Sequence, residues 1–191
     1  RSTLDGDVKN YGVERYRPLR SVHLEKGRTD TRDGDIILRS RTNQSKITVF
    51  MRAHHRFSQE EIEMGTEEED SKISRVFTFQ AEKGKSYTLD KFVWISTDRE
   101  WPIEGTPLPN FASFSFDDLL ASHRDAWERL WKRSNIVIQG DRFAQRTARL
   151  HVYHLLSSAS VHNAEMDTGL PARGLHGEAY RGHIFWDELF V

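Results

Sequence analysis

The chain has 191 residues, of which 37% are hydrophobic and 30% are charged, and it carries a formal net charge of −1. A near-neutral chain lacks the overall positive charge that attracts nucleic acid or an anionic membrane, so we expect neither as a partner. No apolar run approaches the roughly 20 residues that span a bilayer. The absence of cysteine excludes disulfide scaffolds, cysteine-based zinc sites and thiol catalysis.

The two ends of the sequence suggest a fragment. The chain opens at Arg1 and stops at Val191, within an apolar run that starts at Ile184. Natural termini are usually exposed and poorly ordered, so an apolar end of this kind needs a packing partner. We therefore expect the chain to be part of a longer protein, although a native last element that ends abruptly is an alternative.

Residues 1 to about 100 are predicted to form β-structure. Runs enriched in β-branched and aromatic residues begin near Ile36, Ile47, Arg75 and Tyr87, and turn-forming residues separate them. No amphipathic pattern of helical length intervenes. Successive strands are therefore expected to be antiparallel, as in a β-sandwich.

An acidic stretch, Glu60–Asp70, lies between the second and third of these runs. Calcium binding is one interpretation, but the aspartate spacing and the glycine of an EF-hand loop are missing. A solvated hairpin tip is the prediction for this stretch.

Proline and glycine cluster between residues 101 and 114, where neither a helix nor a sheet ladder can be sustained, which indicates a domain boundary. From Ser115 apolar residues recur at spacings of three and four, which predicts one face of a long helix. Asp141 is expected to cap a second helix that ends at about Ser160. The intervening run Ile136–Ile138 is predicted to be a short strand.

Two pairs of side chains on the predicted helices have alternative interpretations. Trp127 and Trp131 share one stripe of the first helix and could form a sugar platform, but core packing is favoured. His151 and His154 stand three residues apart on the second helix and could ligate a metal ion. No third ligand is visible nearby, so packing or hydrogen bonding is preferred, and no metal site is predicted.

Residues 162–190 carry the strongest indication of a functional site. Four of the twelve glycines lie between positions 169 and 182, which indicates irregular backbone and close approaches. Side chains that can form hydrogen bonds are dense in the same stretch, and loops of this kind often hold functional sites. A pyranose has apolar C–H faces and a rim of hydroxyl groups, and Trp186 beside Asp187 offers an aromatic ring for the first and a carboxylate for the second.

Other chemistries do not fit this stretch. The sequence around His176 lacks the paired cysteines of zinc deaminases and the order of a helical zinc protease motif. A Walker-type glycine loop is absent, because no Gly-Lys-Ser/Thr triplet occurs.

The segment Gly174–Glu188, which reads GLHGEAYRGHIFWDE, strongly resembles glycoside hydrolase family 65. That family contains maltose, trehalose and kojibiose phosphorylases together with acid trehalases. Gly12–Leu19 resembles its early strand region, His123–Trp131 its linker helix, and Arg149–Leu156 its first barrel helix. The resemblance thus covers nearly the whole chain.

A β-plus-α fold follows from the resemblance. Residues 1–108 would be part of an N-terminal domain, forming the C-terminal half of an antiparallel β-sandwich (supersandwich). Residues 109–140 would provide a linker helix and the short strand. Residues 141–191 would begin a truncated (α/α)6 catalytic barrel.

The resemblance also implies site residues. Trp186 and Asp187 would hold the glucosyl unit in the −1 subsite, and Phe185 would line the same wall. The family's general acid and its phosphate-binding loop match no position up to Val191, so no catalytic residue is assigned. Possible supporting residues are Arg173, Glu178, His183 and Glu188.

The implied protein is an inverting α-glucoside phosphorylase or hydrolase that acts on a glucose disaccharide such as trehalose, maltose or kojibiose. No cofactor is expected, and inorganic phosphate would be a co-substrate of a phosphorylase. We expect this fragment alone to be inactive. A cytoplasmic location is favoured, because phosphorolysis conserves bond energy in a sugar phosphate that metabolism can use.

The alternative is a noncatalytic β-sandwich module that binds carbohydrate or mediates assembly. Half of a sandwich exposes edge strands that can pair with another copy, so a homodimer is compatible with either interpretation.

Overall fold

The computed structural model describes residues 1–8, 22–59, 61–100, 109–160, 162, 169–175, 180 and 183–186. The chain separates into two compact units, Arg1–Ser113 and Phe114–Val191. The finer predicted division at residues 108 and 140 stays a prediction.

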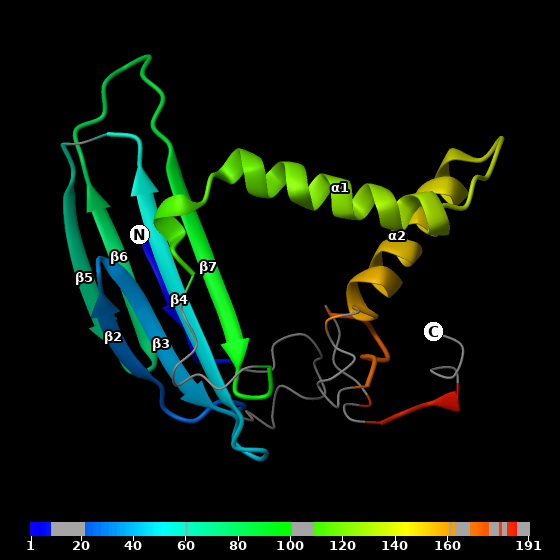
Figure 1. Ribbon diagram of the computed structural model, residues 1–191, viewed down its shortest axis with the longest axis horizontal. Coiled ribbons are helices and arrows are strands. Elements are labelled where there is room, and N and C mark those ends of the chain that lie inside the picture. Colours follow the sequence, from blue (N-terminus) through cyan, green and yellow to red (C-terminus); the bar gives the residue numbers. More distant parts are fainter. Residues whose placement is uncertain are drawn as a thin grey trace. The chain divides into compact units, whose positions relative to one another are not determined.

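Two antiparallel sheets make up the described part of the first unit (Figure 1). One sheet has the strand order β1-β6-β5, and the other has the order β2-β3-β4-β7. The predicted antiparallel arrangement is therefore confirmed. The strands are β1 (Ser2–Asp5), β2 (Arg28–Arg32), β3 (Asp35–Arg41), β4 (Thr48–Phe57), β5 (Glu63–Glu69), β6 (Lys72–Thr78) and β7 (Leu89–Thr97).

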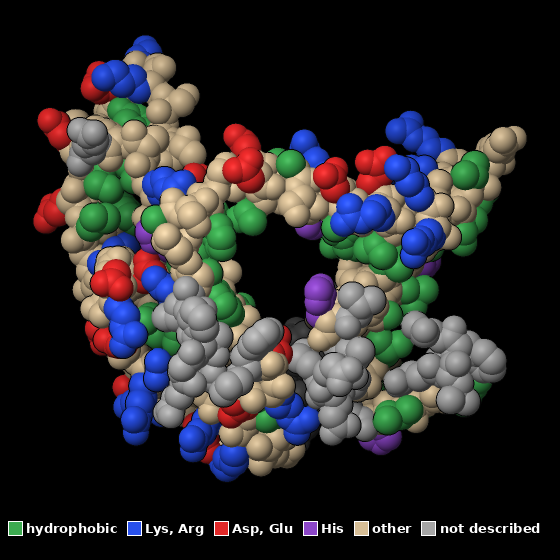
Figure 2. Space-filling model, in the orientation of Figure 1, with side chains coloured by type: hydrophobic (Ala, Val, Ile, Leu, Met, Phe, Trp, Pro, Cys, Tyr) green, Lys and Arg blue, Asp and Glu red, His purple; other side chains and the backbone are tan. Residues whose placement is uncertain are grey.

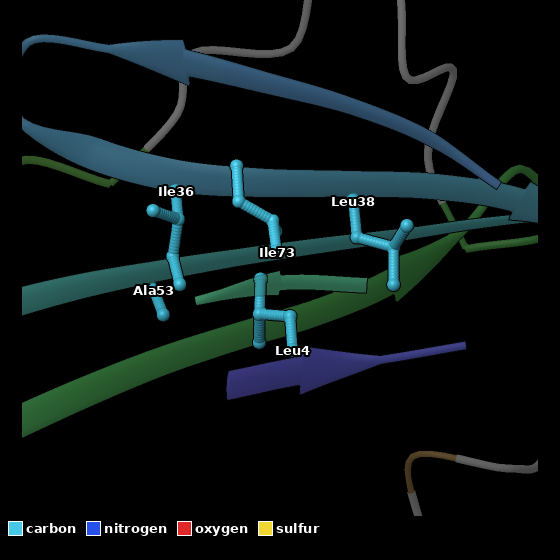
Figure 3. Close-up of a cluster of buried hydrophobic side chains, with 5 residues drawn as sticks. All are labelled: Leu4, Ile36, Leu38, Ala53 and Ile73. Atoms are coloured by element: carbon cyan, nitrogen blue, oxygen red, sulfur yellow. The ribbon is translucent and has the colours of Figure 1, made fainter. Parts of the chain in front are cut away.

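The core of the first unit lies between the two sheets. Its buried side chains come from strands of both, and Figure 3 shows them directed toward one another. Side chains alternate between the two faces of a strand, so Ile36 and Leu38 of β3 enter the core while Ile37 lies on the opposite face. This packing makes the unit a β-sandwich. The cluster consists of Leu4, Ile36, Leu38, Ala53 and Ile73.

The acidic stretch is a strand, so the prediction of a hairpin tip is wrong. β5 pairs with β6 from Glu63 to Glu69, and all its residues are exposed. Its position at the edge of the sheet explains the lack of an apolar alternation, which the sequence argument required. Two of these glutamates form salt bridges with Arg1: Nη1 lies 3.3 Å from Glu67 Oε2, and Nη2 lies 3.2 Å from Glu69 Oε1. Charged side chains of this kind discourage pairing with further strands.

A buried charged cluster lies on the outer face of the four-stranded sheet. Arg52 Nε donates to Asp35 Oδ2, and His54 Nδ1 lies 2.6 Å from Asp35 Oδ1. The 3₁₀ helix η2 (Phe111–Ser113) covers this cluster. The Phe111 ring stacks on His54 with centroids 5.8 Å apart, and the Arg52 guanidinium lies 5.1 Å from the Phe111 centroid. These contacts of Phe111 with His54 and Arg52 hold η2 against the sheet.

His55 occupies the inner face of β4, next to His54 but on the other side of the sheet. Its Nε2 lies 2.8 Å from Ser2 Oγ, and its ring meets Phe77 edge-on at 5.4 Å. Nδ1 is buried and has no hydrogen-bond partner within the described part of the chain. Burial, followed by the positive charges of Lys91 and Arg75, lowers the pKa of His55 to about 4.

Two helices dominate the described part of the second unit, and both begin where the sequence predicts. α1 (Phe116–Ser134) is capped by the Ser115 hydroxyl, which accepts from the Asp118 N–H at 3.4 Å. α2 (Arg142–Ser158) is capped by Asp141, whose Oδ1 accepts from the Ala144 N–H at 2.9 Å. Figure 2 shows hydrophobic side chains gathered along α2.

The aromatic stripe of α1 contacts α2. The rings of Trp127 and Tyr153 stack with centroids 5.1 Å apart, and Trp131 lies 6.2 Å from Trp127. Both tryptophans are half-buried, which agrees with the predicted packing role.

The run Ile136–Ile138 belongs to no strand, unlike the prediction. The side-chain amide of Gln145 takes the place of a partner strand: Oε1 accepts from the Ile138 N–H at 2.7 Å, and Nε2 donates to the Ile136 carbonyl at 2.8 Å. The extended backbone is thus satisfied locally, without a sheet.

Candidate functional site

The structure describes four of the predicted site residues: Arg173, His183, Phe185 and Trp186. Asp187, Glu178 and Glu188 lie outside the described residues. The geometry of the site is therefore built from the aromatic side chains that precede Asp187.

Three rings near the end of the chain form a cluster, the aromatic corner, which consists of Tyr180, His183 and Phe185. His183 and Phe185 are stacked, with centroids 6.2 Å apart and planes 22° apart. Tyr180 stands nearly perpendicular to both, at 5.5 Å from Phe185 and 6.3 Å from His183. Edge-to-face and offset-stacked contacts are the arrangements that aromatic quadrupoles favour.

The backbone reinforces this corner. The His183 N–H donates to the Tyr180 carbonyl at 3.1 Å. Tyr180 has a φ of +50°, in the left-handed region that non-glycine residues rarely adopt. A residue in that region at a ligand site is often held there by its surroundings.

Trp186 follows the aromatic corner directly in the sequence and is 76% exposed, whereas Phe185 is 36% exposed. A large exposed indole offers an apolar face to a ligand. The predicted Phe185 and Trp186 therefore lie together with His183 and with Tyr180, which the sequence analysis did not assign to the site.

Arg173 lines a different feature, a cavity of about 480 Å³ between α2 and residues 170–174. His151 and His154 also line it, and the aromatic corner and Trp186 are not among its described lining residues. A cavity of this volume could hold a small ligand. A role for Arg173 beside Trp186 stays a prediction.

Metal-ligand groups and membrane-spanning helices are two features that the described residues can be searched for. The described residues contain no group of three or more histidine or acidic side chains placed to hold a metal ion. None of the helices among them has the length and apolarity needed to cross a membrane.

Comparison with known families gives two matches. The family model described as glycosyl hydrolase family 65, N-terminal domain, matches residues 1–130. The model described as glycosyl hydrolase family 65 central catalytic domain matches residues 149–191. The predicted family resemblance is confirmed by both.

Several curated proteins are similar to the chain. An uncharacterized glycosyl hydrolase of Mycobacterium tuberculosis is 35% identical over 100% of the chain, which spans 15% of that protein. The trehalose 6-phosphate phosphorylase of Lactococcus lactis is 30% identical over 98% of the chain and 24% of its own length. A kojibiose phosphorylase of Caldanaerobacter subterraneus is 36% identical over 59% of the chain and 15% of its own length. The chain thus spans a quarter or less of these relatives.

A solved structure shares the fold. It is a proposed kojibiose phosphorylase from the human microbiome, with a TM-score of 0.67, and the match covers 97% of the chain and 24% of that structure. Sequence identity is 16%, so this likeness concerns the fold alone. It agrees with the predicted β-sandwich followed by the start of a helical barrel.

Proposed function

Because the chain belongs to glycosyl hydrolase family 65, an enzyme family, we propose that it is part of a phosphorylase that cleaves a glucose disaccharide and that it holds part of the −1 glucose subsite. The observation that carries this proposal is the exposed Trp186 indole beside the aromatic corner. The names of the relatives support phosphorolysis, since they include phosphorylases of trehalose 6-phosphate and kojibiose.

Sugar recognition follows from the chemistry of Trp186 and its neighbours. The exposed indole can stack on the C–H face of a glucose ring, and Phe185 extends the apolar wall. Asp187 comes next in the sequence, and its carboxylate would accept charge-assisted hydrogen bonds from the sugar hydroxyl groups. Together these groups would fix the ring against one side of the site.

The proposed reaction inverts the anomeric centre. A general acid protonates the leaving oxygen while inorganic phosphate attacks the opposite face of the glucosyl unit. Phosphate is itself the nucleophile, so a second carboxylate base is unnecessary, whereas a hydrolase needs one to activate water. In this scheme Trp186 and Asp187 bind and orient the sugar, and the general acid lies outside the 191 residues. We also propose that the protein acts in the cytoplasm and can form a homodimer.

The experiment compares variants of the full-length protein in a phosphate-dependent assay with trehalose, maltose and kojibiose. Release of glucose 1-phosphate is measured, and free glucose formed without phosphate reports hydrolysis. The lost charged hydrogen bond in Asp187→Ala is expected to cost about 2 kcal/mol, which lowers kcat/KM about 30-fold. Trp186→Ala is expected to lower it at least about tenfold.

Asp117→Ala is the matched control, because it removes an exposed carboxylate from the first turn of α1. It should leave kcat/KM unchanged. If Asp187→Ala and Trp186→Ala also leave kcat/KM unchanged, neither residue belongs to the sugar subsite.

A further inference from the structure

We propose that Tyr180 is a positioning residue that sets the direction of the sugar-binding indole of Trp186 through Phe185. This inference rests on the proposed function, because it assigns Tyr180 a role in the same subsite. Neither the family matches nor the names of the relatives assign a role to this residue.

The first support is the geometry of the rings. The Tyr180 ring contacts both members of the His183–Phe185 stack. Its plane makes an angle of 85° with the His183 ring and 88° with the Phe185 ring. A ring that meets two nearly parallel rings at right angles restricts the sliding of either one past the other. Phe185 is therefore contacted by two rings, His183 in a stacked arrangement and Tyr180 in a perpendicular one.

The second support is the backbone at position 180. Two residues of the described segment near the C-terminal end have a positive φ: Gly174, at +68°, and Tyr180, at +50°. Glycine adopts this region without steric cost, whereas tyrosine does not. The tyrosine ring therefore has to provide something that a glycine would lack, and its contacts with His183 and Phe185 are the interactions that a glycine would lose.

The third support is the link from Phe185 to Trp186. These neighbours share one planar peptide unit, so the orientation of the first constrains the starting direction of the second side chain. The indole is 76% exposed, and its direction depends in part on the backbone from which it extends. Fixing Phe185 restricts that direction before the sugar arrives, which favours binding by preorganisation.

A positioning role differs from direct contact with the sugar. A side chain that acts by packing needs its aromatic ring but not its hydroxyl group, so Tyr180→Phe should retain the function and Tyr180→Leu should not. Loss of preorganised binding weakens the ground state and the transition state alike, so KM rises while kcat changes little.

The experiment uses the full-length protein and measures kcat and KM with the disaccharide that the wild type cleaves fastest. Tyr180→Leu is expected to raise KM about tenfold with kcat within about twofold, and Tyr180→Gly, which relieves the backbone but removes the ring, should do the same. Tyr180→Phe should keep KM within about twofold. Tyr153→Leu is the matched control, because Tyr153 stacks on Trp127 instead, and its KM should equal that of the wild type.

A spectroscopic measurement reports the position of the indole directly. The protein is labelled with 5-fluorotryptophan, and the ¹⁹F resonance of Trp186 is assigned by its loss in Trp186→Phe. We expect this resonance to shift or broaden in Tyr180→Leu and to stay unchanged in Tyr180→Phe.

Two results would overturn the proposal. One is a wild-type KM and an unshifted Trp186 resonance in Tyr180→Leu. The other is a tenfold rise of KM in Tyr180→Phe, which would mean that the hydroxyl group contacts the sugar; this second test holds even if the leucine variant does not fold. The proposed function fails separately, if Trp186→Ala and Asp187→Ala retain full activity.

Discussion

Removing the carboxylate of Asp35 is expected to destabilise the β-sandwich strongly. The Asp35 side chain is 1% exposed and that of its partner Arg52 is 11% exposed, so the guanidinium of an Asp35→Leu variant would stay buried without a counter-charge. Breaking a buried pair in this way costs about 3–5 kcal/mol. Arg52 would keep its contacts with the Pro109 carbonyl, at 3.4 Å, and with the Phe111 ring, which places the expected cost near the lower end, at about 3 kcal/mol.

Urea unfolding of the protein measures this cost. With a slope m of about 1.5 kcal/mol per molar, a loss of about 3 kcal/mol lowers the midpoint by about 2 M, and m itself should not change. The double variant Asp35→Leu/Arg52→Met removes both charges and should recover at least about 1 kcal/mol relative to the sum of the single variants.

Asp30→Asn on the neighbouring strand β2 is the control, because Asp30 is exposed, and it should change the stability by less than about 0.5 kcal/mol. A cost below about 1 kcal/mol for Asp35→Leu, or strict additivity in the double variant, would refute the reasoning.

Two further predictions concern His55 and the glycines of the sandwich. The folded pKa of His55 is about 4, below the unfolded value of 6.5, so the unfolded state binds the proton more tightly between these values. Its contribution is full above pH 6.5 and falls by about 1–2 kcal/mol as the pH drops to 4, after allowance for solvent screening of a half-buried group. Urea midpoints between pH 7 and 4 should decline less steeply in His55→Gln, and equal slopes would argue against this origin. Gly27→Ala would place Cβ 2.6 Å from Cδ1 of the fully buried Leu38 and should cost about 1–3 kcal/mol, whereas Gly65→Ala meets no atom within 4 Å and should be nearly neutral; equal melting temperatures of the two variants would contradict this.

Local signals in the sequence predicted much of the fold. The helix starts at Ser115 and Asp141 were found because capping depends on a few adjacent residues. The strand β5 was missed because both faces of an edge strand can be polar, which removes the alternation on which the prediction depended. The pairing of Asp35 with Arg52 and His54 joins residues 17 and 19 positions apart across two strands, and no spacing rule signals it.

The site shows the same division between local and tertiary information. Phe185 and Trp186 were proposed as site residues from a contiguous motif, and their role stays a prediction. Tyr180 was not among the predicted residues, because no periodic pattern relates it to His183 and Phe185, whose rings it contacts. The available signal was the spacing of the rings in a glycine-rich stretch: Tyr180 precedes His183 by three positions and Phe185 by five.

The Gln145 amide has a consequence for the solubility of the protein. Ile136–Ile138 is a β-branched segment in which Ile136 and Val137 are exposed, and intermolecular β-assembly often nucleates from segments of this composition. Because one glutamine already occupies the Ile138 donor and the Ile136 acceptor, a foreign chain that docks here would first have to displace it. The Gln145 side chain thus protects two backbone groups that could otherwise pair with a strand of another molecule.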